Sequence, residues 1–201
     1  WPRGGSAVLE KGDPRYAGYL SECQNGYEYA CSSLMMWHGM PYHSLAHTWF
    51  MHHSRYDGAK RNPWSEVEWG THYSRSMASY GVFLAACGSE YHGPQGRIGF
   101  APRVSPDNFK APFTAAEGWG SFAQKVVDGQ QSATIELRYG KLHLKLLTLD
   151  AAPGTRVSKA VVKLDGRNID ARFEQDGPRT VIRFPQGLDI AAGQTLQVQP
   201  V

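Results

Sequence analysis

The chain has 201 residues and a mass of 22.3 kDa, enough for one domain or two small ones, and its hydrophobic content of 41% can form a core. A net charge of +3 arises from 21 basic and 18 acidic residues, without the basic stripe that is typical of nucleic-acid binding. No apolar run approaches the ~18 residues that a membrane span needs. We therefore expect no nucleic-acid partner and no membrane span, and the sequence leaves the localisation open.

The first residues lack the features of a signal peptide. The stretch WPRGGSAVLE has neither a basic start nor an apolar core. A Trp-Pro start followed by two glycines is typical of an interior loop. We therefore expect that residue 1 is not the beginning of the gene product.

Apolar residues recur at helical spacing between about residues 21 and 87, which predicts three helices. The first contains Leu34 and Trp37 and ends at Gly39 and Pro41. The second contains Leu45, Trp49 and Phe50 and ends near Tyr56. The third carries the clearest amphipathic stripe, which consists of Tyr73, Met77, Tyr80, Leu84 and Cys87.

The remainder of the chain has a different pattern. Residues 88–130 are punctuated by prolines and favour a long, loop-rich connection. From residue 131 onward, apolar and polar residues alternate between Gly-containing turns, and this predicts about six antiparallel strands. The stretches YGKL and LDGR are typical of hairpin loops. The fold class that this pattern predicts is α+β, with a mainly helical block at 1–130 and a small β region at 131–201.

Several histidines and three cysteines raise the question of a metal site. His43 and His47 are one helical turn apart, a spacing that can chelate a metal, but the sequence contains no HExxH motif. Cys23, Cys31 and Cys87 form no CxxC pair and are expected to be free thiols. Hydrogen-bonded or exposed histidines are the favoured interpretation, and we expect neither a metal nor a cofactor.

The stretch RNPWSEVEWGTHYSRSMASYG places several charges at the head of a helix. The SEVE sequence fits a capping box, with Ser65 at the N-cap and Glu68 three residues later. This cap explains Glu68 but not Glu66. Glu66 and Arg75 would face opposite sides of a single helix, and they converge on one ligand only if Glu66 lies in the preceding turn. Charges held against a packed helix need a partner or a ligand.

Two further stretches combine aromatic and acidic residues. In SECQNGYEY, Glu22 and Glu28 lie on either side of Gly26 at the start of the first helix. In AAEGWGSF, two glycines flank Trp119, which predicts a backbone bend that places its ring. Aromatic rings beside carboxylates are typical of sugar sites, because apolar sugar faces stack and hydroxyl groups need charged acceptors.

Four blocks together resemble glycoside hydrolase family 116, which includes bacterial β-glucosidases and the non-lysosomal glucosylceramidase. These blocks are SEC..GYEY, RYDGAKRNPWSEVEWGTHYSRSMASYG, GPQGRIGFAPR and FTAAEGWGSFAQ, in this order. The similarity extends over about residues 1 to 150, and the long RNPW.E.E.G.HY.R.MASY block is the most specific part.

The resemblance implies a fold and an activity. Members of the family have an N-terminal β-sandwich followed by an (α/α)6 barrel, and they are retaining β-glycosidases with one carboxylate as nucleophile and another as acid/base. Both carboxylates would lie upstream of this chain, which would then supply the C-terminal part of the barrel, about three helices and long loops, before the β region. The expected partner is the remainder of the enzyme or a second chain, the expected substrate is a β-glycoside, and the chain alone is expected to be inactive. The alternative is a non-catalytic carbohydrate-binding or structural subunit.

The resemblance also implies substrate-binding residues. Glu22, Glu66 and Arg75 match family residues that bind glucose hydroxyl groups in the subsite where the bond is cut, whereas Glu68 is explained by the helix cap. Gln24 stands where glucosidases of the family often have Trp, so an amide replaces a stacking surface and another pyranose can be the substrate. The sequence alone does not identify the sugar.

Overall fold

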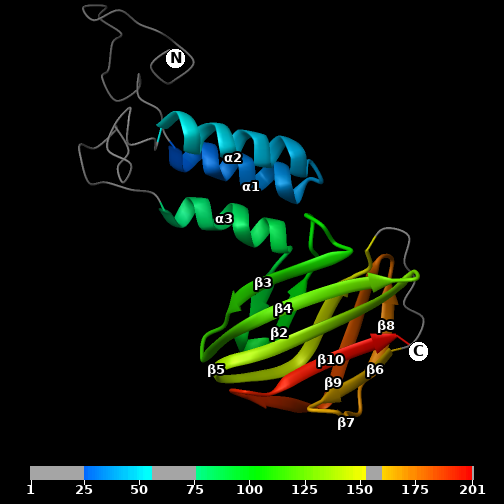
Figure 1. Cartoon of the computed structure of the whole chain (residues 1–201). Helices are drawn as coiled ribbons and strands as arrows, with labels where there is room; N and C mark the ends of the chain where they lie inside the picture. The colour runs from blue at the N-terminus through cyan, green and yellow to red at the C-terminus, as the bar shows by residue number, and fades with distance from the viewer. Residues whose placement is uncertain (1–24, 56–75, 153–159, 201) are drawn as a thin grey trace, which may run out of the picture. The chain divides into compact units, whose positions relative to one another are not determined.

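The computed structural model describes residues 25–55, 76–152 and 160–200, and the chain divides into two compact units, residues 1–86 and 87–201. The described helices are α1 (Asn25–Trp37), α2 (Pro41–Arg55) and α3 (Ser76–Cys87) (Figure 1). The first strands, with a short 3-10 helix η3 (Gly93–Gln95), are β1 (Glu90–His92), β2 (Arg97–Phe100), β3 (Asn108–Thr114), β4 (Gly118–Val127) and β5 (Gln130–Asp150). The others are β6 (Ala160–Leu164), β7 (Arg167–Asn168), β8 (Arg172–Asp176), β9 (Arg179–Ala191) and β10 (Thr195–Pro200).

A tight turn joins α1 to α2. Gly39 adopts a left-handed backbone with φ of 75°. Its N–H donates to the Met36 carbonyl at 3.2 Å and the Met40 N–H donates to the Met35 carbonyl at 2.9 Å, a pattern that satisfies carbonyls at a helix end. Pro41 then begins α2, where its missing N–H has no helical partner to lose. The predicted helix end at Gly39 and Pro41 is confirmed.

Small polar side chains connect the three helices. The Ser44 Oγ donates to the Ser32 carbonyl at 2.7 Å between α2 and α1, and the Ser33 Oγ donates to the Gly81 carbonyl of α3 at 3.0 Å. One buried side chain from each helix completes a small core, which consists of Tyr29, Met51 and Val82. The three predicted helices are therefore present, and their contact faces are built on short side chains.

The apolar stripe predicted for the third helix is buried only in part. Met77 is 87% exposed and Tyr80 is 44% exposed, whereas Val82 and Ala85 are buried. Because Ser33 contacts the backbone at Gly81, the side of α3 next to Gly81 faces α1. Of the stripe, Cys87 is buried and Leu84 is half-buried, while Met77 and Tyr80 are open to solvent. The helix itself is confirmed, and what covers its exposed apolar side chains stays a prediction.

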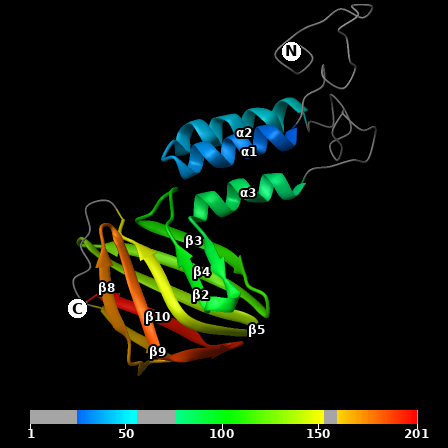
Figure 2. The same cartoon turned by 180° about the vertical axis from the view of Figure 1, so that it is seen from behind.

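Residues 1–86 are here called the helical unit and residues 87–201 the β unit. The strands of the β unit form two layers that share β5 (Figure 1, Figure 2). The six-strand layer has the order β3-β4-β5-β10-β6-β7, and the five-strand layer has the order β1-β2-β5-β9-β8. The first half of β5 pairs with β4 and β10, and its second half pairs with β2 and β9. The pairing of β2 with β5 is parallel, and the other pairings are antiparallel.

The core lies between these two layers. Phe100 of β2 in the five-strand layer stacks on Phe122 of β4 in the six-strand layer, with ring centroids 4.0 Å apart and an interplanar angle of 6°. Phe113 of β3 meets Phe100 edge-on at 5.8 Å. The other large core side chains with almost no exposed surface are Ile98, Ile135, Leu137, Leu144, Leu147, Ile182, Ile190 and Leu196. Inward and outward residues alternate along the strands, and each layer therefore buries one face against the other, as in sandwich folds.

The predicted fold class, part of an (α/α)6 barrel followed by a small antiparallel β region, is wrong. Within the described ranges the structure has three short helices and ten strands, and a mixed sheet rather than a barrel segment dominates the fold. The stretch 88–130, expected to be loops, contains β1 to β4. Pro112 was interpreted as part of a loop, but it lies in β3. Among the described residues β3 pairs with β4 on one side only, so it is an edge strand, and an edge strand tolerates the missing N–H of a proline.

Two predicted hairpin loops have different outcomes. LDGR is confirmed, because Asp165 and Gly166 have φ of 49° and 80° between β6 and β7, the backbone of a two-residue hairpin turn. YGKL is wrong, because Gly140 lies inside β5, which continues from residue 130 to 150. A chain reversal that the local sequence suggested is therefore replaced by a longer strand.

The side-chain alternation of β5 changes phase in the middle of the strand. Its inward residues are odd-numbered from 131 to 137 and even-numbered at 142 and 144. The register against β4 shifts between Trp119 and Gly120, where Tyr139 and then Leu137 are the partners and Arg138 is the extra residue. This β-bulge leaves both Arg138 and Tyr139 exposed, and it places Tyr139 on the outer face of the layer, opposite Trp119.

Candidate functional site

The four residues predicted to bind sugar lie outside the described residues. Glu22 and Gln24 precede α1, and Glu66 and Arg75 lie between α2 and α3. Their roles therefore stay predictions, as does the capping role of Glu68. The candidate site that the structure does describe belongs to the β unit.

The histidines and cysteines of the described ranges are dispersed. Within these ranges no three residues of the types His, Cys, Asp and Glu are grouped so that they could hold a metal ion. His47 instead forms a hydrogen bond through its Nδ1 with the Ser32 Oγ at 2.8 Å. Cys31 is an exposed free thiol, and burial raises the pKa of the Cys87 thiol to about 11, which keeps it protonated and unreactive at neutral pH.

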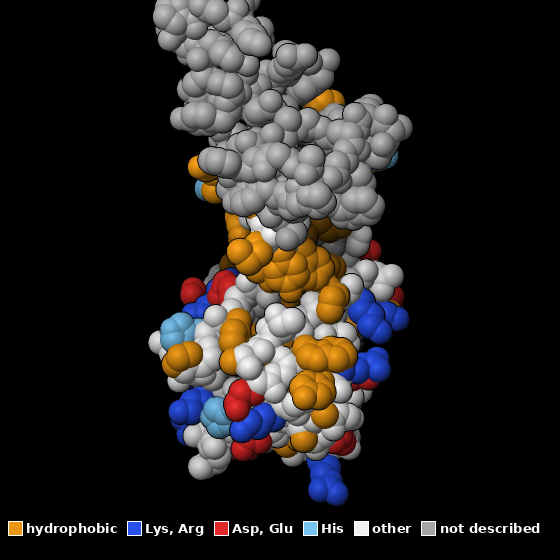
Figure 3. Space-filling model, turned by 90° about the vertical axis from the view of Figure 1, so that its left-hand side faces the viewer, with side chains coloured by type: hydrophobic (Ala, Val, Ile, Leu, Met, Phe, Trp, Pro, Cys, Tyr) orange, Lys and Arg blue, Asp and Glu red, His pale blue; other side chains and the backbone are white. Residues whose placement is uncertain are grey.

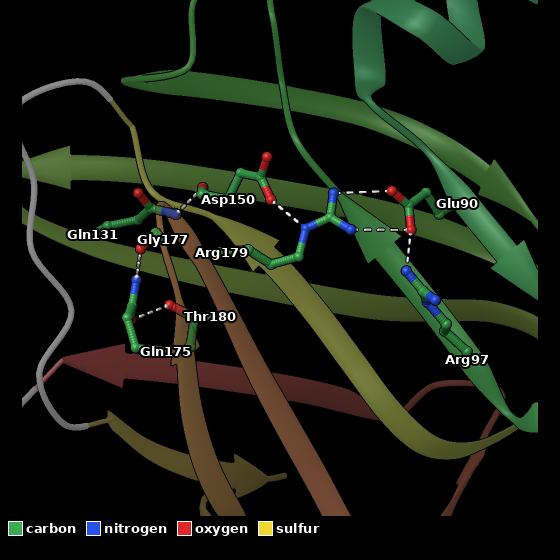
Figure 4. A network of polar contacts seen from close by, with 8 residues as sticks. All are labelled: Glu90, Arg97, Gln131, Asp150, Gln175, Gly177, Arg179 and Thr180. Atoms are coloured by element: carbon green, nitrogen blue, oxygen red, sulfur yellow. Dashed lines mark hydrogen bonds and ion pairs between the residues drawn. The ribbon is translucent and has the colours of Figure 1, made fainter.

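The most extensive charged cluster connects four strands (Figure 4). The Glu90 carboxylate of β1 accepts from Arg179 of β9 at 2.9 Å and also from Arg97 of β2. The Arg179 Nε donates to the Asp150 Oδ1 of β5 at 2.9 Å. Burial alone would lower the pKa of Arg179, but the hydrogen bonds and charges of Asp150 and Glu90 outweigh it and raise this pKa. The four side chains form an alternating chain of opposite charges.

The geometry of this cluster is that of ion pairs that hold strands together rather than that of a catalytic site. Both carboxylates are occupied by guanidinium groups, so the oxygens of Glu90 and Asp150 are engaged in ion pairs within the protein. Next to it, the buried Gln131 amide donates to the Asp150 carbonyl at 3.0 Å and to the Gln124 Oε1 at 3.0 Å. These polar contacts join the two ends of β5 and so tie the two layers together.

A different arrangement surrounds the AAEGWGSF motif. Trp119 of β4 is 51% exposed, and its direct neighbour across the strands is Tyr139 of β5, which is 65% exposed. Their rings are nearly parallel, with an interplanar angle of 17° and centroids 6.3 Å apart. The sequence predicted a placed ring at Trp119 but gave no signal for Tyr139, because only the bulge in β5 turns this residue outward.

The charged side chains of this unit are mixed in sign. On the face that Figure 3 shows, blue and red side chains are interspersed, and hydrophobic side chains form one larger group and several smaller ones. Among the described helices, none is long and apolar enough to cross a membrane.

Comparisons with known proteins give limited information. No family model matches the chain, and no curated protein matches it. A GH127 β-L-arabinofuranosidase from Geobacillus stearothermophilus T6 is 13% identical, with a TM-score of 0.37 over 63% of this chain and 18% of that chain. An α-L-rhamnosidase from Dictyoglumus thermophilum is 14% identical, with a TM-score of 0.35 over 68% of this chain and 16% of that chain.

Both of these solved structures are glycosidases, and this chain spans less than a fifth of the length of each. Likeness at these scores is too weak to assign an activity or a family. Membership of family 116 is not confirmed by any of the three comparisons. The assignment therefore depends on the sequence blocks.

Proposed function

We propose that this chain is a segment of a family-116-like retaining β-glycosidase and contributes sugar-binding residues to a catalytic site on another part of the enzyme. The observation that carries the proposal is the ordered set of four sequence blocks, above all RNPWSEVEWGTHYSRSMASYG. These blocks bring Glu66 and Arg75 onto positions that resemble ligands of the cleaved sugar. Nucleophile and acid/base are two further carboxylates of the same enzyme.

In this proposal Glu66 and Arg75 act as a pair. The Arg75 guanidinium keeps its charge throughout, neutralised by Glu66 in the empty site, and it donates hydrogen bonds to sugar hydroxyl groups in the filled site. Glu66 and Glu22 accept hydrogen bonds from further hydroxyl groups. Gln24 offers an amide in place of a stacking ring, so we expect Gln24→Trp to raise the preference for β-glucosides over other β-glycosides.

The described charged cluster of the β unit is consistent with catalysis elsewhere in the enzyme. Glu90 and Asp150 are each bound by an arginine, and neither has the freedom that a nucleophile or an acid/base needs. The exposed aromatic side chains of α2 give a second line of support. Tyr42 is 85% exposed and Trp49 is 62% exposed, and an apolar helix surface of this kind is typical of a face that contacts more protein.

The decisive experiment is steady-state kinetics on the enzyme that contains this chain, with an aryl β-glycoside as substrate. Glu66→Gln and Arg75→Ala each remove hydrogen bonds to the sugar and leave the other charge unpaired. We expect each to cost about 2–4 kcal/mol in transition-state binding, roughly 30- to 1000-fold in kcat/KM. Glu68→Gln is the matched control, and we expect it to change kcat/KM by only a few-fold and stability by about 1 kcal/mol or less.

Two results would contradict the proposal. A larger kinetic effect of Glu68→Gln than of Glu66→Gln would reverse the roles of these carboxylates. Turnover of an aryl β-glycoside by the purified 201 residues alone would show that the catalytic carboxylates lie in this chain.

The alternative is a carbohydrate-binding subunit without chemistry, and the exposed pair of Trp119 and Tyr139 favours it. Kinetics separate the two functions. If neither Glu66→Gln nor Arg75→Ala changes kcat/KM while both weaken sugar binding, the chain binds carbohydrate without taking part in cleavage.

A further inference from the structure

Trp119 and Tyr139 form an exposed pair of near-parallel rings, here called the aromatic platform, on the outer side of the six-strand layer. We propose that the aromatic platform binds a neutral glycan by stacking against an apolar sugar face. The aromatic platform is made of other residues than Glu66 and Arg75, and the proposal does not rest on their role. The argument has four parts: how the rings are aimed, what fixes them, which charges surround them, and what the neighbouring surface offers.

The bulge at Arg138 aims the second ring. Residues of β5 that precede it point inward at odd numbers, so an unbroken alternation would turn Tyr139 into the core beside Leu137. The extra residue instead leaves Tyr139 directly opposite Trp119, on the outer side. β-bulges are over-represented beside functional sites because they re-aim a side chain at the cost of regular pairing. The bulge also lies where β5 passes from the six-strand layer to the five-strand layer, so the same irregularity that bends the strand brings Tyr139 to the outer side.

Glycines hold the strands close together around the two rings. A Cβ on Gly120 would lie 2.1 Å from the Glu136 carbonyl oxygen, and one on Gly140 would lie 2.0 Å from the Glu117 carbonyl oxygen. Gly140 also has a positive φ of 74°, a backbone that favours glycine. The backbone beneath Trp119 is therefore fixed by packing that tolerates no side chain. A rigid backbone lowers the entropy cost of presenting a ring to a ligand.

The charges at the edge of the aromatic platform cancel. Lys141 pairs with Glu117 at 3.1 Å, and Arg138 pairs with Glu136 at 3.0 Å. All four side chains remain about a third or more exposed, so their free hydrogen-bonding atoms face solvent. Carboxylate oxygens can accept from sugar hydroxyl groups, and the ammonium and guanidinium groups can donate to them. The balance of two cations and two anions suits a neutral, hydroxyl-rich ligand.

The surface beyond the rings is polar and regular. Ser121 is two residues from Trp119 along β4, roughly 7 Å away in strand geometry, and its Oγ lies 3.5 Å from a Glu136 carboxylate oxygen. The next outward row of the same layer has Thr134 and Gln197 as direct neighbours on β5 and β10, with Ala123 beside Thr134 and a lysine toward each end, Lys110 and Lys163. Hydroxyl and amide groups at strand spacing can follow a chain of sugar residues that starts on the rings. A ligand longer than one sugar is therefore favoured.

Other ligand classes fit this surface less well. Single-stranded nucleic acid also stacks on aromatic rings, but it requires cations for its phosphates next to the stacked bases, whereas the cations beside the two rings, Lys141 and Arg138, are each paired with a carboxylate. A protein partner favours a continuous apolar centre, whereas the rings are followed by Ser121 and Thr134. The combination of two rings and balanced polar groups is the one that a neutral glycan matches.

Affinity electrophoresis of the full chain tests the proposal. The gels contain one polysaccharide each: a soluble β-1,4-glucan, xylan, arabinan or mannan as neutral probes, and polygalacturonate as the anionic comparison. We expect at least one neutral polysaccharide to retard the chain. Trp119→Ala and Tyr139→Ala should each weaken this retardation by about tenfold or more, because truncated aromatic anchors dominate losses of binding. Trp119→Phe, which keeps a ring, should retain a measurable part of it.

The controls separate stacking on the aromatic platform from general adhesion. Tyr42→Ala removes an exposed aromatic side chain from α2, and we expect retardation to be unchanged. The proposed function is tested by the kinetics of Glu66→Gln against Glu68→Gln, and this proposal is tested by retardation of the Trp119 and Tyr139 variants, so failure of one and failure of the other give different results. The proposal is overturned if no neutral polysaccharide retards the chain, if only polygalacturonate does, or if Tyr42→Ala acts like Trp119→Ala.

A second measurement applies if an alanine variant fails to fold. The indole N–H resonance of Trp119 is identified as the signal lost in Trp119→Phe, and the chain is titrated with the oligosaccharide of the retarding polymer. We expect this resonance to shift with saturation while the indole signals of the other tryptophans stay in place. A Trp119 resonance that does not move overturns the proposal.

Discussion

The helical unit and the β unit use their hydrophobic side chains in opposite ways. In the helical unit, Tyr42, Trp49 and Met77 are 85%, 62% and 87% exposed, while the buried positions of α1 include polar Asn25 and Ser32. In the β unit, the large aliphatic residues of β5 and β9 are almost completely buried between two layers. Large hydrophobic side chains therefore form a closed core in the β unit, whereas several of them form an exposed apolar surface in the helical unit.

This difference shows what a hydrophobic period does and does not establish. A period of 3.6 or 2 identifies the faces of an element, but it doesn't say which face meets a neighbour of the same chain. The β unit satisfies its alternation internally because β5 serves both layers. The described helices pack through serines, a glycine and the small core of Tyr29, Met51 and Val82, and they leave several large side chains exposed.

The largest effect is expected in the core of the β unit. Phe122 is fully buried and stacks on Phe100 at 4.0 Å. We expect Phe122→Ala to lower the free energy of unfolding by about 3–5 kcal/mol, because it removes a large apolar side chain and leaves a cavity. Urea unfolding followed by circular dichroism measures this. A loss below about 1 kcal/mol would mean that the two layers do not share a tight core.

A pH effect is expected from Cys87, which lies where the two units meet in the sequence. Burial raises its pKa from 9.0 to about 11, so between these values the unfolded chain loses the proton while the folded chain keeps it. The folded state then binds more protons than the unfolded state. The free energy of unfolding therefore falls as the pH rises through this interval, with a total loss of about 2 kcal/mol. Unfolding of Cys87→Ala compared with the parent chain from pH 8 to 11 isolates this contribution, and parallel curves would contradict it.

A smaller effect is expected from the charged cluster of the β unit. Glu90→Gln removes the carboxylate that binds both Arg97 and Arg179, whose side chains are 36% and 30% exposed. We expect a loss of about 1–2 kcal/mol, limited by solvent screening and reduced further by salt. Glu174→Gln breaks the exposed pair with Arg183 in the same layer and is the matched control, with a loss of about 0.5 kcal/mol or less. Equal losses in the two variants would show that the cluster is no stronger than a surface pair.

The smallest effect is expected on the outer face of the helical unit. Trp49 is 62% exposed, and we expect Trp49→Ala to change the free energy of unfolding by about 0.5 kcal/mol or less. Met51 is two residues away on the same helix and fully buried, and Met51→Ala should cost about 2–4 kcal/mol. Denaturant unfolding of both variants measures the contrast. A cost of Trp49→Ala close to that of Met51→Ala would remove the difference between the two units.

The candidate sites differ in how far the sequence predicts them. Glu22, Gln24, Glu66 and Arg75 came from a resemblance, lie outside the described residues and stay predictions. Trp119 was singled out by its flanking glycines, and the structure places its ring in the open. Tyr139 could not be predicted, because its direction depends on a pairing irregularity against β4 that leaves no trace in the local sequence.

The sequence by itself determined the local elements of this protein. Helical spacing with Gly39 and Pro41 defines α1 and its end, and Asp165-Gly166 defines a turn, because these choices depend on interactions within a few residues. Only the tertiary structure decided that YGKL continues as a strand and that residues 88–130 join a mixed sheet. Those outcomes depend on pairing with strands far away in the chain. The free energy of that pairing and of the core behind it outweighs local turn and proline preferences.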